Sequence, residues 1–339
     1  MEAAFRVGVG RDLRGADGLP VHDLGLELLE AEPGVSWEFM PDHAPVLSPA
    51  AVADYDAVMI WGAGGIDATT LAGADRLRLI ARFGMGLDAI DLDACGERRV
   101  LVTVAPEAVR TAVPAGAMAF VLALAHRLPE KDRLVREGRW GDAFDHVGLG
   151  TTGRTIGVVG LGNIGASLLR LAEPFGFRLL GTDPHTHTRR HELPAALERV
   201  DLETLLRESD FVCITCPLTE LTRDLIDAER LRLLAPHAYL INIARGGIVD
   251  SRAVAAAVRA GRLAGAALDV FEQEPIEPDH PLLELGDKVI LSPHATAYTR
   301  AAFRSLGVSA CESVLALAAG EMPRNPVNPE ILDPAVRSD

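Results

Sequence analysis

Residues 157–171 read GVVGLGNIGASLLRL. Within this stretch, Gly160, Gly162 and Gly165 form a G-x-G-x-x-G pattern directly after a short run of apolar, mostly β-branched residues. In such a pattern the first glycine permits a tight turn from strand to helix, the second lets the backbone approach a pyrophosphate, and the third lets the helix pack against the strand. Amide groups at the start of the helix then face the phosphates. The stretch therefore predicts a dinucleotide-binding turn.

The residues on both sides of the glycines support this interpretation. Residues 155–159 predict a buried parallel strand, and apolar residues at helical spacing follow the glycines. A second strand, at 178–182, ends at Asp183, which is 18 residues after Gly165. An acidic residue at this distance suits the 2′-hydroxyl of a ribose. Without this context the glycines would indicate only a βα turn that binds nothing.

The composition limits the classes of protein to consider. A chain of 339 residues predicts two domains, and 48% hydrophobic with 24% charged residues is typical of a soluble globular enzyme. The formal net charge of −15 argues against general affinity for nucleic acid or an anionic membrane. No uninterrupted apolar run approaches the roughly 18–20 residues of a membrane span, and the N-terminus does not have the pattern of a secretory signal. We therefore expect a cytoplasmic protein.

The four cysteines do not make a disulfide framework in a chain of this length, which fits a reducing compartment. Cys213 and Cys216 form a C-x-x-C motif at the end of the apolar run 211–214. A redox pair prefers the first cysteine at the start of a helix, and zinc needs a second pair elsewhere. We therefore expect buried hydrophobic cysteines and no metal site. The histidines of the loop 183–191 have no spacing typical of a metal site either.

Strands alternate with helices along the chain, which predicts parallel sheets covered on both faces. In the first part we expect strands at 5–10, 36–40, 55–60, 78–83 and 100–104, and helices at 23–30, 49–53, 67–72 and 91–97. A helix at 113–126 is apolar on nearly all sides and should be buried, and a more polar one follows at 130–138. After the glycine pattern we expect strands at 178–182, 211–214, 238–243, 263–268 and 288–291, and helices at 201–208, 227–233 and 250–260.

The last helix, at 299–319, follows the final strand of the second domain and has no sheet of its own. We expect it to return to the first domain. The predicted fold class is α/β, with two doubly wound parallel-sheet domains. A flavodoxin-like domain is discontinuous and comprises 1–104 and 299–339, and a Rossmann domain comprises 105–298.

Three titratable residues follow strands of the second domain, where open α/β sheets bind ligands. Arg245 precedes two glycines and can present its planar guanidinium to a carboxylate. Glu274 follows the strand 263–268, and His294 follows the strand 288–291. Reduction of a keto acid needs a cation for the carboxylate, an acid for the developing alkoxide, and a carboxylate that orients and charges that acid. Arginine, histidine and glutamate supply these three roles.

These stretches resemble the D-isomer-specific 2-hydroxyacid dehydrogenase family. The blocks that match its pattern in order and spacing are ARFGMGLDAIDLDA (81–94), GVVGLGNIG (157–165), TCPLTELTRDLID (215–227), INIARGGIVD (241–250), ALDVFEQEP (267–275) and SPHAT (292–296). The resemblance implies an NAD-dependent oxidoreductase that interconverts a small 2-oxo acid and its D-2-hydroxy acid. It also implies that the flavodoxin-like domain holds the substrate, that the Rossmann domain holds NAD, and that two copies form a homodimer through the cofactor domain.

The resemblance implies roles for individual residues. Arg245 would bind the substrate carboxylate, and His294 would exchange a proton with the carbonyl oxygen. Glu274 would hydrogen-bond His294 and favour its charged form. Met85 and Gly86 match the loop whose amides hold the substrate carboxylate. The positions that match cofactor-lining residues are Gly160, Gly162, Asn163, Ile164, Gly165, Asp183, Pro217, Thr222, Ala244 and Asp269, the last of them near the nicotinamide carboxamide.

The sequence departs from the family pattern at three places near the expected domain junction. Ala115 stands where an acidic residue is common, Val104 where the pattern has asparagine, and Ala89 where a second asparagine is frequent. These changes leave the arginine, glutamate and histidine intact. They make the identity of the substrate an open question.

Two further alternatives follow from the same residues. Asp183 would repel a 2′-phosphate and so favours NAD, whereas Arg189 and Arg190 could bind that phosphate in NADP. Members of the resembling family also oxidise formate or phosphite, and some bind NAD(H) as transcriptional co-repressors without turnover. We expect NAD and catalytic turnover.

Overall fold

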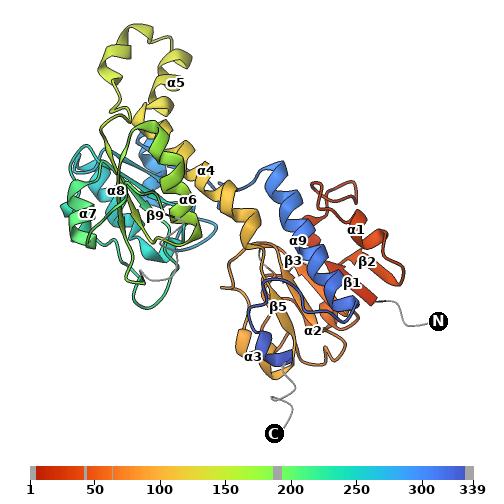
Figure 1. Cartoon of the computed structure of the whole chain (residues 1–339). Coiled ribbons are helices and arrows are strands. Elements are labelled where there is room, and N and C mark those ends of the chain that lie inside the picture. The colour runs from red at the N-terminus through yellow and green to blue at the C-terminus, as the bar shows by residue number, and fades with distance from the viewer. Residues whose placement is uncertain (1–4, 42–43, 63, 186–192, 333–339) are drawn as a thin grey trace. The chain divides into compact units, whose positions relative to one another are not determined.

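The computed structural model describes residues 5–41, 44–62, 64–185 and 193–332, and the chain forms two compact units (Figure 1). Unit 1 comprises Met1–Val109 and Tyr298–Asp339, and unit 2 comprises Arg110–Ala297. The chain therefore leaves unit 1, completes unit 2 and returns to unit 1. The first division falls later than the expected residue 104, because the first turn of helix α4 (Pro106–Ala125) belongs to unit 1, where Ala108 is buried in the core.

Unit 1 is built on a five-stranded parallel sheet with the strand order β2-β1-β3-β4-β5. Helices α1 and α9 pack on one face of this sheet, and α2 and α3 pack on the other. The order is that of flavodoxin-like folds. The elements are β1 (Phe5–Val9), α1 (Glu27–Glu30), β2 (Val35–Phe39), α2 (Pro49–Val52), β3 (Ala57–Ile60), β4 (Leu79–Arg82), α3 (Leu92–Glu97), β5 (Leu101–Thr103) and α9 (Arg300–Ala318).

Unit 2 is built on a seven-stranded parallel sheet with the order β12-β11-β10-β9-β6-β7-β8. Helices α7 and α8 pack on one face, and α4 and α6 pack on the other. The order reverses between β6 and β9, which is where Rossmann folds bind their ligands. The elements are α5 (Leu128–Arg136), β6 (Thr155–Val159), α6 (Asn163–Ala172), β7 (Arg178–Thr182), β8 (Glu198–Arg199), α7 (Leu202–Glu208), β9 (Phe211–Ile214), β10 (Tyr239–Asn242), α8 (Ser251–Arg259), β11 (Gly265–Leu268) and β12 (Val289–Leu291). The predicted fold class of two parallel-sheet α/β domains is confirmed.

Two helices expected in unit 1 are wrong. The helix expected at 23–30 is reduced to α1, because Gly25 has a φ of +70° and its amide donates to the side chain of Asp23, 3.1 Å away. Residues 67–72 form turns. There the side chain of Asp67 accepts from the amide of Thr70 at 2.9 Å, which stabilises a local turn in competition with a helix.

In unit 2 the helix expected at 227–233 is a short 3-10 helix, η5 (Arg230–Leu233). The side chain of Asp227 accepts from the amides of Glu229 at 3.0 Å and of Arg230 at 2.8 Å, and so forms a turn before that segment. The two-residue strand β8 was not expected.

Helix α4 begins at Pro106, seven residues before its expected start, because proline suits the first position of a helix. Ala117, Val121 and Ala125 are buried along one side of it, whereas Ala115 and Ala119 are exposed. Within a single chain, therefore, the expected burial of this helix holds for one side and not for the side of Ala115 and Ala119. By length and composition α4 and α9 could each cross a membrane, but core helices of water-soluble proteins meet the same criterion.

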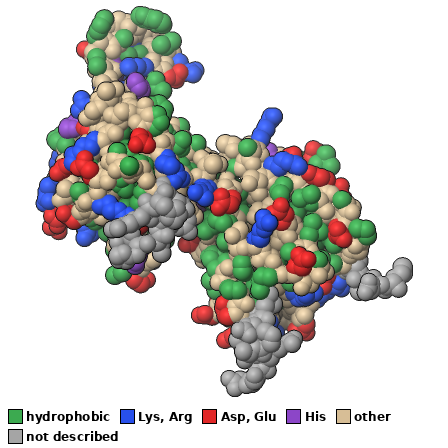
Figure 2. Space-filling view, viewed as in Figure 1, with side chains coloured by type: hydrophobic (Ala, Val, Ile, Leu, Met, Phe, Trp, Pro, Cys, Tyr) green, Lys and Arg blue, Asp and Glu red, His purple; other side chains and the backbone are tan. Residues whose placement is uncertain are grey.

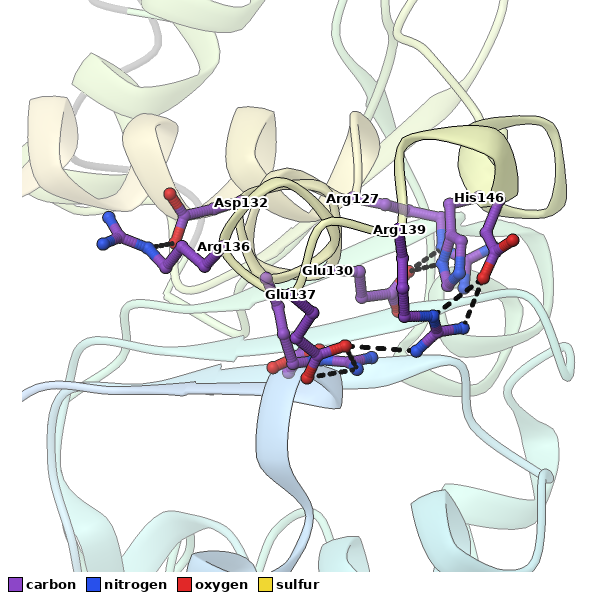
Figure 3. Close-up of polar contacts among 10 residues, drawn as sticks. Arg127, Glu130, Asp132, Arg136, Glu137, Arg139 and His146 are labelled. Atoms are coloured by element: carbon purple, nitrogen blue, oxygen red, sulfur yellow. Dashed lines mark hydrogen bonds and ion pairs between the residues drawn. The ribbon is translucent and has the colours of Figure 1, made fainter.

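Helix α5 and the 3-10 helix η2 (Trp140–His146) project from the rest of unit 2 (Figure 1). We call residues 128–147 the arm. Figure 3 shows the ion pairs that hold its parts together. Arg139 pairs with Glu137 at 3.2 Å and with Asp142 at 2.7 Å, and Nδ1 of His146 lies 3.1 Å from Glu130. These contacts connect η2 to α5 and give the arm a defined shape.

Candidate active site

The glycine pattern lies between the end of β6 and the start of α6, at the reversal of strand order in unit 2. Gly160 has a φ of +98°, and a Cβ there would lie 2.6 Å from the amide nitrogen of Cys216. A Cβ at Gly165 would lie 2.0 Å from the carbonyl oxygen of Gly160. Gly162 precedes α6, and a Cβ there would have no heavy atom within 4 Å. Packing thus requires glycine at positions 160 and 165. Gly162 instead leaves open space before the helix amides, as a pyrophosphate requires.

Asp183 lies beside this turn, one residue after the end of β7. Its Oδ2 accepts from the amide of Leu161 at 2.7 Å, and its Oδ1 accepts from the amide of His185 at 2.8 Å. A carboxylate has about four acceptor positions, so these two bonds leave capacity for a ribose hydroxyl. Arg189 and Arg190, which could favour NADP, lie outside the described residues, as do His187 and His191.

The other expected cofactor positions gather at the same edge of the sheet. Asn163 and Ile164 form the start of α6. After β9, the hydroxyl of Thr222 donates to the carbonyl oxygen of Pro217 at 2.7 Å and so folds that loop. Ala244 is buried after β10. The residues around the glycine turn therefore fit a dinucleotide.

Sequence reasoning missed Thr215, which closes the glycine turn from β9. Its hydroxyl donates to the carbonyl oxygen of Gly160 at 2.7 Å. Cys213 and Cys216 on either side of it are free and buried, as expected. Burial raises the pKa of the Cys216 thiol to about 11, so this thiol is neutral and unsuited to redox chemistry near pH 7.

Arg245 lies in a tight turn after β10 that the buried side chain of Asn242 holds in place. The Nδ2 of Asn242 donates to the carbonyl oxygen of Arg245 at 2.9 Å, and its Oδ1 accepts from the amide of Ala244 at 3.1 Å. The next residue must be glycine, because a Cβ at Gly246 would lie 1.8 Å from the carbonyl carbon of Phe271. The turn that carries Arg245 therefore packs directly on the segment that carries Glu274.

His294 and Glu274 form a hydrogen-bonded pair. The Nδ1 of His294 lies 2.9 Å from Oε2 of Glu274, and Oε1 of Glu274 accepts from the amide of Phe271 at 3.1 Å. Burial tends to raise the pKa of Glu274, but the bonds from His294 and Phe271 and the charges of His294 and Arg245 outweigh it. The pKa of Glu274 therefore lies below its ordinary value, and the pair leaves Nε2 of His294 as the ring nitrogen that can face a substrate.

The backbone of His294 is held in an unusual conformation with a φ of +54°. Its amide donates to the carbonyl oxygen of Asp269 at 2.7 Å. The buried side chain of Asp269 accepts from the amides of Ala295 at 2.9 Å and Thr296 at 3.0 Å. The resemblance placed Asp269 near the nicotinamide, and the structure adds that it anchors the loop of His294. A left-handed residue costs free energy and persists where its surroundings fix it.

A mostly apolar cavity of about 410 Å³ borders this pair. Its lining includes Phe271, Ile276, Leu283, Leu291 and Pro293, together with Glu274 and His294. The cavity thus gives the pair an apolar wall on one side, while the side chains of His294 and Glu274 remain 48% and 40% exposed to solvent.

Met85 and Gly86 belong to unit 1, in the loop after β4. Met85 is exposed, and the carbonyl oxygen of Gly86 accepts from Nε of Arg82 at 3.1 Å. Ala89 and Val104 lie in the same unit, after β4 and β5. Ala115 is exposed on α4 in unit 2. Among the described residues, no three His, Cys, Asp or Glu side chains are grouped so that they could hold a metal ion.

The geometry of unit 2 defines an α/β dehydrogenase with a dinucleotide site, and comparison with known proteins specifies its family. Residues 118–296 match the family model described as D-isomer specific 2-hydroxyacid dehydrogenase, NAD binding domain. The chain is 41% identical over 286 residues to a glyoxylate reductase of Korarchaeum cryptofilum, a match that covers 83% of this chain and 85% of that protein.

Two further proteins are similar over most of this chain. A D-3-phosphoglycerate dehydrogenase of Archaeoglobus fulgidus is 35% identical over 311 residues, which cover 92% of this chain and 57% of that protein. A crystal structure of D-lactate dehydrogenase from Aquifex aeolicus, complexed with NAD and lactic acid, is 26% identical. It superposes with a TM-score of 0.82 over 95% of this chain and 98% of that one.

The chain belongs to the D-isomer specific 2-hydroxyacid dehydrogenase family. It is an NAD-dependent oxidoreductase that acts on CH–OH groups and interconverts 2-oxo acids and 2-hydroxy acids. The expectations of family, reaction class and NAD as cofactor are confirmed.

Proposed function

We propose that Arg245, Glu274 and His294 carry out this reaction. The observation that carries the proposal is the 2.9 Å bond between Nδ1 of His294 and Glu274, with the charge of Arg245 acting on the same carboxylate. All three residues follow strands of the sheet whose glycine turn fits the dinucleotide. This arrangement combines an anion-binding cation with an oriented proton donor.

Each side chain has a role that its contacts support. The nicotinamide of NADH supplies the hydride in reduction. The guanidinium of Arg245 binds the substrate carboxylate and orients the 2-oxo group, which a planar fork does better than a point charge. Nε2 of His294 donates a proton to the carbonyl oxygen as negative charge develops there. Glu274 holds Nδ1 and stabilises the protonated ring. In oxidation the proton returns to Nε2.

We propose glyoxylate, or another 2-oxo acid of similar size, as the preferred substrate. The support is the 41% identity to a protein named glyoxylate reductase over most of both chains. Steady-state kinetics with NADH across a panel of 2-oxo acids tests this proposal. The highest kcat/KM is expected for glyoxylate, and a preference for a larger or phosphorylated acid contradicts it.

Substitution of the two polar groups that meet the substrate tests the site. Arg245→Ala is expected to raise KM for the 2-oxo acid steeply, because the carboxylate loses its partner. His294→Ala is expected to depress kcat by about 10²–10⁴-fold with a smaller change in KM, because it removes the proton donor. The exposed Leu221, in the loop after β9, provides a control in Leu221→Ala, which is expected to behave as wild type. Wild-type kinetics in both active-site variants would disprove the assignment.

We also propose that the protein is a cytoplasmic homodimer formed through the arm. Trp140 and Phe144 on the arm are 75% and 90% exposed, and Leu128, Val135 and Val147 are exposed beside them. Figure 2 shows hydrophobic side chains gathered over the arm. Exposed apolar surface of this kind is typical of a protein interface, and a second copy of the chain offers the same surface. The four free, buried cysteines suit a reducing compartment.

A further inference from the structure

Residues 271–274 connect the two parts of the proposed active site. The peptide between Phe271 and Glu272 packs against Gly246, where a Cβ would lie 2.3 Å from the amide nitrogen of Glu272. The amide of Phe271 also donates to the carboxylate of Glu274. Any shift of this segment would therefore disturb both the turn of Arg245 and the carboxylate that orients His294. The contacts that fix residues 271–274 are therefore important for the position of Arg245 and for that of Glu274.

The side chain of Glu272 fixes this segment to the start of α8. Its Oε1 accepts from the amide of Ser251 at 2.8 Å, and its Oε2 accepts from the hydroxyl of Ser251 at 2.7 Å. Ser251 is the first residue of α8 and is 3% exposed. The bidentate contact holds one loop at the N-terminal end of a helix, where a negative charge is favoured.

His280 completes this network from the other end of the same loop. Its Nε2 lies 3.0 Å from the hydroxyl of Ser251, and its Nδ1 accepts from the amide of Leu282 at 3.3 Å. Because Nδ1 accepts, Nε2 carries the ring proton and donates to Ser251. The hydroxyl of Ser251 in turn donates to Glu272, so each member of the chain has its partner.

This direction of donation excludes a nucleophilic role for Ser251. A hydrolytic triad needs the serine hydroxyl to donate to a histidine that a carboxylate orients. Here the histidine donates to the serine, and the carboxylate contacts the serine instead of the histidine. Ser251 and His280 are also buried. The three residues therefore have a positioning role rather than a chemical one.

We propose that Glu272, held by Ser251 and His280, is a positioning residue that sets the place of Glu274 and thereby the protonated state of His294. This inference rests on the proposed function, because it requires His294 to be the proton donor. Loss of the anchor would let residues 271–274 move, and misplacement of about 1 Å in an active site can lower the rate by about a hundredfold. The glycine turn and Asp183 lie on other elements and would be unaffected.

The test is the pH dependence of NADH-driven reduction in Glu272→Ala and Glu272→Gln. In Glu272→Ala we expect kcat to fall about tenfold and the alkaline limb of kcat/KM to move by about half a pH unit to lower pH, because a displaced Glu274 stabilises the protonated donor less. Glu272→Gln keeps one acceptor for the amide of Ser251 and is expected to be intermediate. NADH affinity, measured by fluorescence, should not change in either variant.

Arg252→Ala is the matched control. Arg252 lies next to Ser251 on α8, and its side chain forms an exposed ion pair with Glu277 of the same loop. Wild-type kcat and pH dependence are expected for it. If Glu272→Ala behaves like this control while His294→Ala is impaired, the inference is wrong and the proposed site stands. If His294→Ala keeps wild-type kcat, the proposed site itself is wrong. A positioning role is also wrong if both Glu272 variants contain less active enzyme but keep the wild-type alkaline limb of kcat/KM. That result would mean that Glu272 supports folding only.

Discussion

The carboxyl group of Glu274 interacts with His294, Phe271 and Arg245, and its pKa lies below its ordinary value. When folding lowers the pKa of a carboxyl group, its charged form stabilises the folded protein. This contribution to the free energy of unfolding is fully present above the ordinary pKa and is lost as the pH falls through the lowered pKa. Glu274 therefore remains charged at neutral pH. The His294–Glu274 bond is then available across the whole neutral range.

Glu274→Gln is expected to lower kcat about 10–100-fold and to move the alkaline limb of the reduction profile to lower pH. Glutamine removes the negative charge that stabilises the protonated ring, and its amide can donate to Nδ1, which favours the neutral histidine. The measurement is kcat/KM against pH from about 5 to 9. Gln273→Ala, at the exposed neighbouring position, is the control. An unchanged alkaline limb in Glu274→Gln would contradict the role of this carboxylate.

For the site residues, the sequence predicts which polar side chains come together. It does not predict which buried side chains hold them in position. Arg245, Glu274 and His294 could be proposed because their types and their positions after strands suit one reaction. Asn242, Ser251 and His280 carry no such signal, because a buried polar residue is recognised only when its partners are known. Their partners come from loops 3 to 29 residues away.

Two glycines of the turn between β6 and α6 are needed for different reasons, one for binding NADH and the other for packing. Gly162→Ala is expected to keep the thermal stability and to weaken NADH binding at least tenfold, because its Cβ enters open space that the pyrophosphate needs. Gly165→Ala is expected to lower the stability by about 1–3 kcal/mol, because its Cβ overlaps the carbonyl oxygen of Gly160. Thermal unfolding and NADH fluorescence on both variants distinguish the two effects. Equal losses of stability would contradict this division.

The sequence predicts the type of an element correctly where hydrophobic periodicity alone decides it. The prediction fails where a side chain forms hydrogen bonds that compete with those of the backbone. The strands β6, β7 and β9 have the expected bounds: β6 and β9 are buried throughout, and β7 is buried at its three central residues. Asp250 caps α8, accepting from the amide of Ala253 at 2.8 Å, at the residue where the expected helix 250–260 begins. Asp67 and Asp227 instead form turns where helices were expected. Helix propensity summed over a stretch of sequence does not include a single side-chain hydrogen bond of this kind.

At the scale of the molecule, the exposed aromatic residues of the arm allow a test of the dimer. Trp140→Ser combined with Phe144→Ser is expected to convert a dimer into a monomer, because it removes the largest exposed apolar side chains of that surface. Light scattering coupled to size exclusion measures the mass. Met322→Ser, which changes an exposed apolar residue of unit 1, should leave the dimer intact. A wild-type monomer would disprove the proposal directly.

The interrupted path of the chain through unit 1 has a consequence for how the protein is made. Phe303, Leu306 and Cys311 of α9 fill the core beneath the sheet of unit 1, yet the ribosome adds them only after all 188 residues of unit 2, Arg110–Ala297. At about 5–20 residues per second, the five N-terminal strands wait roughly 10–40 s for this helix. During that time the apolar face that α9 will cover is open to solvent, so synthesis exposes it to chaperones and to aggregation until unit 2 is complete and α9 follows.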